Sequence, residues 1–129
     1  MLLAVVRGAF PADDPRTLAT VEAVRRELAV DEFVYRFRHD DRPLHKAEGS
    51  FLLCGFWMAQ IEHTYGNLVT AAHWFERTRG ACGPAALYTE EYDVHQRQLR
   101  GNLPQAFVHA GLLECAVTLS RDVRPHRTS

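Results

Sequence analysis

The sequence predicts an all-α fold built from four helices. In four segments, apolar residues recur at spacings of three and four, which is the period of one helix face. Residues suited to helix ends (Asp, Ser, Asn, Pro and Gly) flank these segments. No segment shows an alternation of comparable strength that would predict a strand. With 129 residues, 47% of them apolar, the chain is large enough for one domain or part of one.

The first helix is expected over residues 15–28. Asp14 precedes it as a candidate N-cap, and Pro15 suits the first helical position. The charged residues of this segment lie mostly off a single apolar stripe, which is formed by Leu18, Val21, Val24 and Leu28. We therefore expect one buried and one exposed face.

The second helix is expected over residues 50–65, with Ser50 as its cap and Gly66 directly after its end. Its run from Phe51 to Ala59 is apolar almost all round. A helix of this kind is buried on most sides rather than lying on a surface. The aromatic residues of the expected helices are therefore interpreted as core rather than as sugar-stacking platforms: Phe51, Phe56, Trp57 and Trp74.

The third and fourth helices are expected over residues 67–79 and 104–119. The third begins at a capping Asn67 and ends near Gly80, with an apolar stripe formed by Leu68, Ala71, Ala72 and Phe75. The fourth begins at Pro104 and has few polar faces. Residues 121–129 form a polar, basic tail that we expect to fray.

Two connections are unusually long: residues 29–49 and 81–103 each span roughly twenty residues, and such loops are often functional in compact domains. Antiparallel helices place both connections at one end of the molecule, where they lead into the second and fourth helices. One end of the expected bundle is therefore elaborated, at the starts of its two most apolar helices.

The amino-acid composition limits the classes of function that this chain can have. The formal net charge of −1 and the scattered histidines indicate neither a nucleic-acid partner nor an acidic ligand. Three widely spaced cysteines (Cys54, Cys82 and Cys115) favour reduced thiols and a cytoplasmic location, and no C-x-x-C pair predicts zinc. His73 and His109 lack a second ligand at suitable spacing, so we expect no metal and no cofactor. The first ten residues lack the charged start of a signal peptide and the length of a membrane span, so no membrane association is expected.

The long connections carry the polar groups that can bind or catalyse. Arg36 can donate a fork of hydrogen bonds, and Glu48 can accept them. In the second connection Glu90, Glu91 or Asp93 can act as a general base if the geometry is right, often with a second carboxyl group. From composition alone, solvated Arg–Asp pairs and an acidic segment beside a helix are the favoured interpretations.

Four ordered blocks alter that balance. The blocks "GAFPADDPRTLATVEAVRREL", "FVYRFRHDD", "AEGSFLLCGFW" and "LYTEEYDVHQRQLRGNLPQAFVHAGLLECA" resemble the C-terminal part of glycoside hydrolase family 15, the glucoamylase-like and bacterial trehalase-like enzymes, over residues 8–121. The resemblance implies a partial (α/α)6 barrel, about four helices of a six-hairpin toroid. The active site of that fold lies at the N-terminal ends of the inner helices, which here would be the second and fourth.

The resemblance also implies site residues. Members of the family hydrolyse α-glucosidic bonds with inversion of the anomeric configuration, using two carboxyl groups. Glu90 matches the general base of the family, with Glu91 as the alternative. Arg36 matches the arginine that grips the sugar at the cleavage point. Further sugar contacts are implied for Glu48, Asn102 and Gln105.

Departures from the family limit the expected activity. Arg100 stands where an apolar residue is expected, and Lys46 where a small or neutral one is. The family's general acid belongs to an earlier loop that this chain does not contain, whereas inversion needs two carboxyl groups about 6.5–9.5 Å apart. We therefore expect the C-terminal segment of an inverting α-glucoside hydrolase that carries the base, lacks the acid and is inactive alone.

The alternative is a non-catalytic helical remnant or interaction module. The expected partners are an α-glucoside in the complete barrel, and either the missing N-terminal barrel portion or a second copy of the chain.

Overall fold

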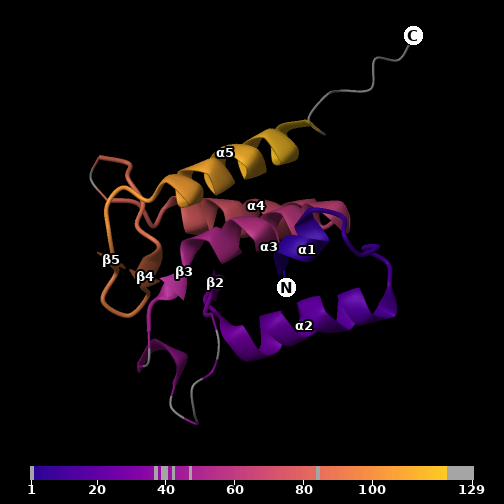
Figure 1. Cartoon of the computed structure of the whole chain (residues 1–129), viewed down its shortest axis with the longest axis horizontal. Helices are drawn as coiled ribbons and strands as arrows, with labels where there is room; N and C mark the ends of the chain where they lie inside the picture. The colour runs from indigo at the N-terminus through magenta and orange to yellow at the C-terminus, as the bar shows by residue number, and fades with distance from the viewer. Residues whose placement is uncertain are drawn as a thin grey trace.

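The computed structural model describes residues 2–36, 38, 41, 43–46, 48–83 and 85–121. Within this part the chain is mostly helical (Figure 1), with α1 (Leu2–Val6), α2 (Pro15–Leu28), α3 (Leu52–Thr64), α4 (Leu68–Arg79) and α5 (Ala106–Ser120). The four predicted helices are confirmed as α2 to α5, with ends that differ by at most two residues. Helix α1 was not predicted, because five apolar residues are too few to show a helical period.

Helix α2 begins as its sequence predicts. The Asp14 side chain accepts a hydrogen bond of 2.8 Å from the Arg16 amide, and Pro15 follows at the first position. The predicted stripe is wrong at Leu18, whose side chain is 45% exposed. Thr17 and Val21 are buried instead, so the inward face of this helix is rotated by about one residue from the predicted one.

Helix α3 lies at the centre of the molecule and packs against α4 and α5. Four of its large apolar side chains are almost completely buried: Leu52, Phe56, Met58 and Ile61. The prediction that Ser50 caps this helix is wrong, because its hydroxyl donates to the Tyr92 carbonyl in a strand pair, and Phe51 occupies the cap position. The Leu52 amide donates instead to the Glu90 carbonyl at 3.1 Å, which satisfies one of the first helical N–H groups.

The turn between α3 and α4 is short. Gly66 adopts a positive φ of 79° directly after α3, as expected for a helix end. Asn67 precedes α4 but does not cap it with its side chain. Its side-chain amide nitrogen donates instead to the carboxylate of buried Glu62 at 2.8 Å. The predicted α4 stripe is wrong at Leu68 and Ala72, which are exposed, and Trp74 is buried on this helix instead.

Helices α3 and α4 approach each other closely at Gly55. A Cβ atom on Gly55 of α3 would lie 2.1 Å from the Thr78 hydroxyl oxygen of α4. A glycine is therefore required at this contact.

Short strands connect the long loops. Strands β1 (Ala29–Val30) and β2 (Phe33–Val34) form one antiparallel pair. A second antiparallel sheet has the order β3-β4-β5, with strands β3 (Ser50–Phe51), β4 (Glu91–Asp93) and β5 (Gln98–Arg100). Segments of two or three residues are too short to show alternation, which is why none was predicted. The sheet ties the two long connections together where α3 and α5 begin, so their predicted placement at one end is confirmed (Figure 1).

Helix α5 begins at Ala106 rather than at the predicted Pro104, which lies in the preceding turn after a cis peptide bond. Its inner face packs on α3, where a Cβ on Gly111 would lie 2.4 Å from a methyl group of Leu53. Of the predicted polar tail, only Arg121 lies within the described residues. Among the described residues, no helix combines the length and the apolar character needed to cross a membrane.

Candidate active site

A cavity of about 450 Å³ opens at the end of the molecule where α3 and α5 begin. Helices α1, α2, α3 and α5 and strands β2 and β3 all contribute to its wall. Among the described residues, the charged ones that line it are Arg36 and Glu90, and the others are Leu2, Val24, Leu28, Val34, Tyr35, Phe51, Leu53, Cys54, Trp57 and Phe107. Two charged groups in a largely apolar, aromatic wall form the usual composition of a small-molecule site.

Arg36 is placed by strand β2 and the residue that follows it. The Tyr35 amide donates to the Leu28 carbonyl at 2.8 Å, and the Tyr35 side chain is buried. This contact fixes the main chain just before Arg36. The guanidinium carbon of Arg36 lies 5.5 Å from the centre of the Phe51 ring, within cation–π range. The side chain is therefore held over strand β3 at the cavity.

Glu90 is placed by the start of α3. Its carbonyl accepts the Leu52 amide, and strand β4 begins at the next residue. Its side chain is half-buried and lines the cavity. Residues of the two long connections, separated by more than fifty positions in sequence, thus meet at one cavity.

Glu91 has a different environment. Its carboxylate accepts a 3.3 Å hydrogen bond from the Gly49 amide, in the pairing of β3 with β4. Glu91 therefore contacts the main chain just before β3, whereas Glu90 lines the cavity. Glu91 does not line the cavity.

The other three predicted sugar contacts do not line the cavity either. Glu48 is half-buried just before strand β3. Gln105 is half-buried before α5, where its amide donates to the Tyr88 carbonyl at 2.8 Å. Asn102 is exposed in the turn that follows β5. The structure therefore brings Arg36 and Glu90 together and leaves these three outside the wall.

Sequence reasoning missed part of the wall. Phe51 and Trp57 were interpreted as core, but both are only partly buried and line the cavity. Leu53, Cys54 and Trp57 follow one another on one face of α3, and this spacing is the signal that groups them. Burial raises the pKa of the Cys54 thiol to about 11, so this wall residue is uncharged at neutral pH.

Strands β4 and β5 form a hairpin held by a buried carboxylate. Asp93 accepts a 2.9 Å hydrogen bond from the Gln96 amide and forms an ion pair with Arg100. The Gln96 amide, with the charge of Arg100 as a smaller contribution, lowers the pKa of Asp93 below its ordinary value. Arg100, which stands where the resemblance implies an apolar residue, thus neutralises a buried acid. Lys46, where a small or neutral residue is implied, is exposed.

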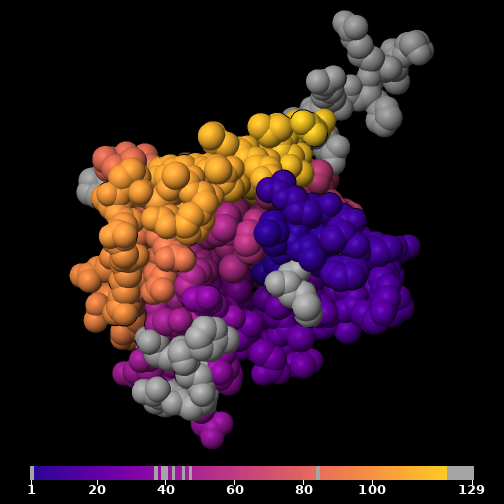
Figure 2. Space-filling view, in the orientation of Figure 1, coloured from indigo at the N-terminus to yellow at the C-terminus, as the bar shows by residue number. Residues whose placement is uncertain are grey.

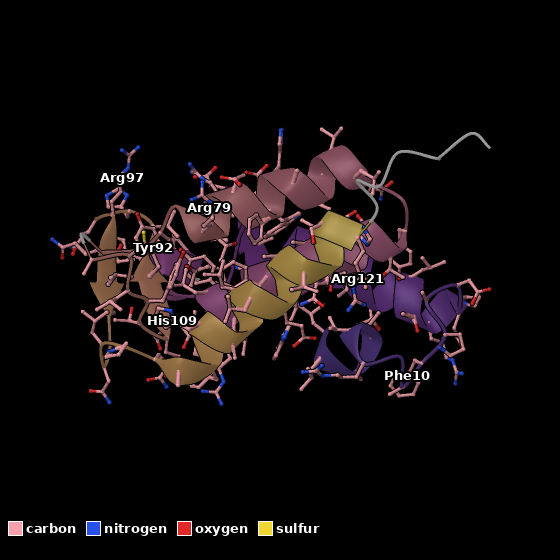
Figure 3. All side chains as sticks on the ribbon, turned by 90° about the horizontal axis from the view of Figure 1, so that it is seen from above. Phe10, Arg79, Tyr92, Arg97, His109 and Arg121 are labelled. Carbon is pink, nitrogen blue, oxygen red and sulfur yellow. The ribbon has the colours of Figure 1, made fainter. Side chains whose placement is uncertain are left out.

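Tyr88 joins the second long connection to two helices. Its hydroxyl donates to the Arg79 carbonyl at 2.7 Å, and its amide donates to the His109 imidazole at 3.1 Å. His109 is therefore a hydrogen-bonded helix residue, as predicted. Figure 3 shows His109 near the start of α5, and Arg97 extending away from the helices at the hairpin. Among the described residues, no group of three or more His, Cys, Asp or Glu is placed to hold a metal ion.

Comparison with known proteins identifies relatives of this sequence. The sequence model of the glycosyl hydrolases family 15 matches residues 1–117. The trehalase of Mycolicibacterium smegmatis is 39% identical over 123 residues, which cover 94% of this chain and 18% of that protein. The trehalase of Mycobacterium tuberculosis is 37% identical over the same shares. The trehalase of Thermoplasma volcanium is 32% identical over 88% of this chain and 18% of that protein.

The chain thus spans about 18% of the length of these curated relatives. No solved structure matches the chain. The family match covers most of the chain, including both long connections and the residues that line the cavity. The chain belongs to the glycosyl hydrolases family 15.

Proposed function

We propose that this chain supplies one part of the catalytic site of an inverting α-glucoside hydrolase. The observation that carries the proposal is the meeting of Arg36 and Glu90 at one cavity. The family match and the trehalase names of the relatives support a glycosidic substrate. Trehalose is the first substrate to test, and maltose and dextrins are the alternatives.

In this proposal Glu90 is the general base. Its carboxylate takes a proton from a water molecule, which attacks the anomeric carbon from the face opposite the leaving oxygen. Arg36 binds the sugar, because its planar guanidinium presents several N–H donors to hydroxyl groups in a fixed arrangement. The aromatic wall residues Phe51 and Trp57 exclude water and contact the apolar face of the ring.

The leaving oxygen also needs a proton from a second carboxyl group, about 6.5–9.5 Å from the base. In the part of the chain that the structure describes, Glu90 carries the only carboxyl group that lines the cavity. We therefore propose that the general acid comes from polypeptide outside these 129 residues. On this account residues 1–129 are a C-terminal fragment of the catalytic domain.

The fold of that fragment is proposed to be part of an (α/α)6 barrel. Helices α3 and α5 would be inner helices, and α2 and α4 outer ones. The support is the placement of both long connections, and of the cavity, at the starts of α3 and α5. Glu48, Asn102 and Gln105 would face sugar only after the rest of the barrel reshapes this end. The three cysteines are free, which supports the proposed cytoplasmic location.

The second candidate function is a non-catalytic interaction module. It is favoured by the exposed apolar side chains of α5, because large apolar patches mark interaction sites. The two functions differ in what Glu90 does, so substitution of this residue separates them.

The test is a chimera in which this chain replaces its matching segment in the trehalase of Mycolicibacterium smegmatis. Glu90→Gln should lower kcat for trehalose hydrolysis at least about 10²-fold, because an amide cannot take the proton from water. KM should change little, since the amide keeps the size of the carboxylate.

Glu91→Gln is the matched control, because Glu91 accepts from the Gly49 amide outside the cavity. A larger loss of kcat at Glu91 than at Glu90 would reassign the base. Equal activity of the chimera and its Glu90→Gln variant would favour the non-catalytic module.

A further inference from the structure

The main chain that carries Glu90 is held by contacts on both sides of that residue. Tyr88 and Thr89, which precede it, are each only 2% exposed. The Thr89 hydroxyl donates to the Glu91 carbonyl at 2.7 Å, across Glu90. The Glu90 carbonyl accepts from the Leu52 amide at 3.1 Å. These contacts leave the segment little freedom, so the position of Tyr88 helps to fix where the Glu90 carboxylate lies.

Tyr88 is bound to the start of α5 through both of its main-chain groups. Its carbonyl accepts a hydrogen bond of 2.8 Å from the Gln105 amide, and its amide donates at 3.1 Å to Nε2 of His109. Gln105 and His109 are four positions apart and therefore lie on the same side of the helix start. Figure 2 shows the start of α5 and the hairpin segment that precedes it, in orange, packed together at one end of the molecule. The first turn of α5 is thus joined directly to the segment that carries Glu90.

The bond between Tyr88 and His109 requires one form of the imidazole ring. A main-chain N–H can only donate, so Nε2 must carry a lone pair, and the proton of the neutral ring is then on Nδ1. The His109 ring also packs edge-on against the Tyr88 ring, with centroids 5.1 Å apart. The Tyr88 hydroxyl is bound elsewhere, to the Arg79 carbonyl, and burial raises its pKa to about 12, so it stays a donor near neutral pH. Loss of the imidazole acceptor would leave a buried N–H without a partner, which is unfavourable.

We propose that His109 is a positioning residue for the general base. Through the Tyr88 amide, it holds the main chain in the position from which Glu90 reaches the water. His109 is not among the described residues that line the cavity, so it acts through Tyr88 rather than on the sugar. A misplacement of about 1 Å can cost about 10²-fold in rate, so a small shift of this segment is enough to matter. The inference rests on the proposed function of Glu90.

Two substitutions in the chimera separate the hydrogen bond from the ring contact. His109→Phe keeps an aromatic ring beside Tyr88 but removes the acceptor, whereas His109→Gln removes the ring and supplies a carbonyl acceptor of similar reach. His109→Phe should lower kcat for trehalose at least about tenfold and change KM less than about twofold. His109→Gln should recover most of the lost kcat. Equal values of kcat in the two variants, or a lower value in His109→Gln, would overturn the proposal.

His73→Phe is the matched control for the loss of a helix histidine. The side chain of His73 is 67% exposed on α4, so kcat and KM should stay unchanged. A loss of kcat equal to that of His109→Phe would contradict a specific role for His109.

The same substitution is also made in a chimera that already carries Glu90→Gln. There His109→Phe should lower the residual rate by less than about twofold, because the carboxylate that it positions is absent. A further tenfold loss would overturn the proposal, since His109 would then act by another route. If Glu90→Gln alone leaves kcat unchanged, the proposed base is rejected. If Glu90→Gln lowers kcat and His109→Phe does not, only the role of His109 is rejected.

A spectroscopic measurement keeps the proposal testable if His109→Phe does not fold. In the unmodified 129-residue chain, ¹⁵N NMR near neutral pH should show the His109 proton on Nδ1. It should also show a coupling between Nε2 and the Tyr88 amide nitrogen across the hydrogen bond. A proton on Nε2 of His109 would overturn the proposal, because that nitrogen could not accept from Tyr88.

Discussion

Helices α3 and α5 have similarly apolar sequences but very different surroundings. Helix α3 is packed by α4 and α5, and its side chains are buried on several sides, including Leu52, Phe56 and Met58. Helix α5 rests on α3 with one face, where only Val108, Gly111 and Cys115 are buried. Two helices of similar apolar composition can therefore be buried to different extents. The extent depends on the elements that pack against each helix in this chain.

The largest expected difference between the two helices is in core packing. Phe56→Ala in α3 should lower the free energy of unfolding by about 3–5 kcal/mol, because Phe56 is completely buried. Leu113→Ala in α5 should change it by less than about 0.5 kcal/mol, because Leu113 is mostly exposed. Urea unfolding of the isolated chain measures both. Similar losses would mean that α5 is covered in solution, for example by self-association.

A glutamate on each helix provides the second comparison. Glu62 of α3 is buried and pairs with Arg25, whereas Glu114 of α5 forms an exposed pair with Arg7. Glu62→Ala should cost about 3 kcal/mol, at the low end for a broken buried pair because Arg25 is partly solvated. Glu114→Ala should cost about 0–1 kcal/mol, as expected for a surface pair. Thermal or urea unfolding of the two variants measures both losses in the free energy of unfolding. Equal losses would contradict the difference in burial between the two pairs.

The third comparison uses the glycine on each helix. Gly55→Ala in α3 should destabilise by about 1–3 kcal/mol, because the new methyl group meets Thr78. Thr78 is fully buried and donates to the Trp74 carbonyl at 2.8 Å, so it has little room to move.

Gly111→Ala in α5 should be close to neutral. The nearest atom is the end of the flexible Leu53 side chain, and alanine favours the helix by about 1 kcal/mol over glycine. Differential scanning calorimetry of both variants makes the test. A larger loss at Gly111 would place α5, rather than α4, in the tighter contact with α3.

The smallest expected effect is in the β4–β5 hairpin, which precedes α5. The lowered pKa of Asp93 means that its ionised form stabilises the fold above the ordinary carboxyl pKa. That contribution is lost as pH falls through the lowered pKa of the folded state. Asp93→Asn should therefore destabilise the chain near pH 7, by less than about 1 kcal/mol because Arg100 is partly solvated. The difference in the free energy of unfolding between the unmodified chain and Asp93→Asn should disappear in acid. A difference that stays constant with pH would exclude ionisation of Asp93 as its source.

Much of the helical framework could be predicted from sequence. Strong local signals define α2, where Asp14 and Pro15 mark the start and the ends are correct. Helix α5 begins two residues later than predicted, because Gln105 is fixed to Tyr88 by a contact across the chain. The strands were missed because each has only two or three residues, and the pairing of β3 with β4 joins residues about forty positions apart.

The candidate site could be predicted only in part. Resemblance to the family selected Arg36 and Glu90, and the structure places both at one cavity. Local pattern did not separate Glu90 from Glu91, because the separation depends on the pairing of β4 with β3. It also missed Phe51 and Trp57, since partial burial at the start of a helix depends on the packing of several elements around it.

The central claim is that this chain holds the base of a catalytic pair and requires further polypeptide for the acid. The most direct measurement is glucose release from trehalose by the purified chain alone, at several concentrations. It is repeated after addition of the Mycolicibacterium smegmatis trehalase polypeptide from which the matching segment has been removed. The account predicts no turnover by the chain alone and turnover in the mixture, abolished by Glu90→Gln. Turnover by the chain alone that Glu90→Gln abolishes would contradict it, because the 129 residues would then form a complete site.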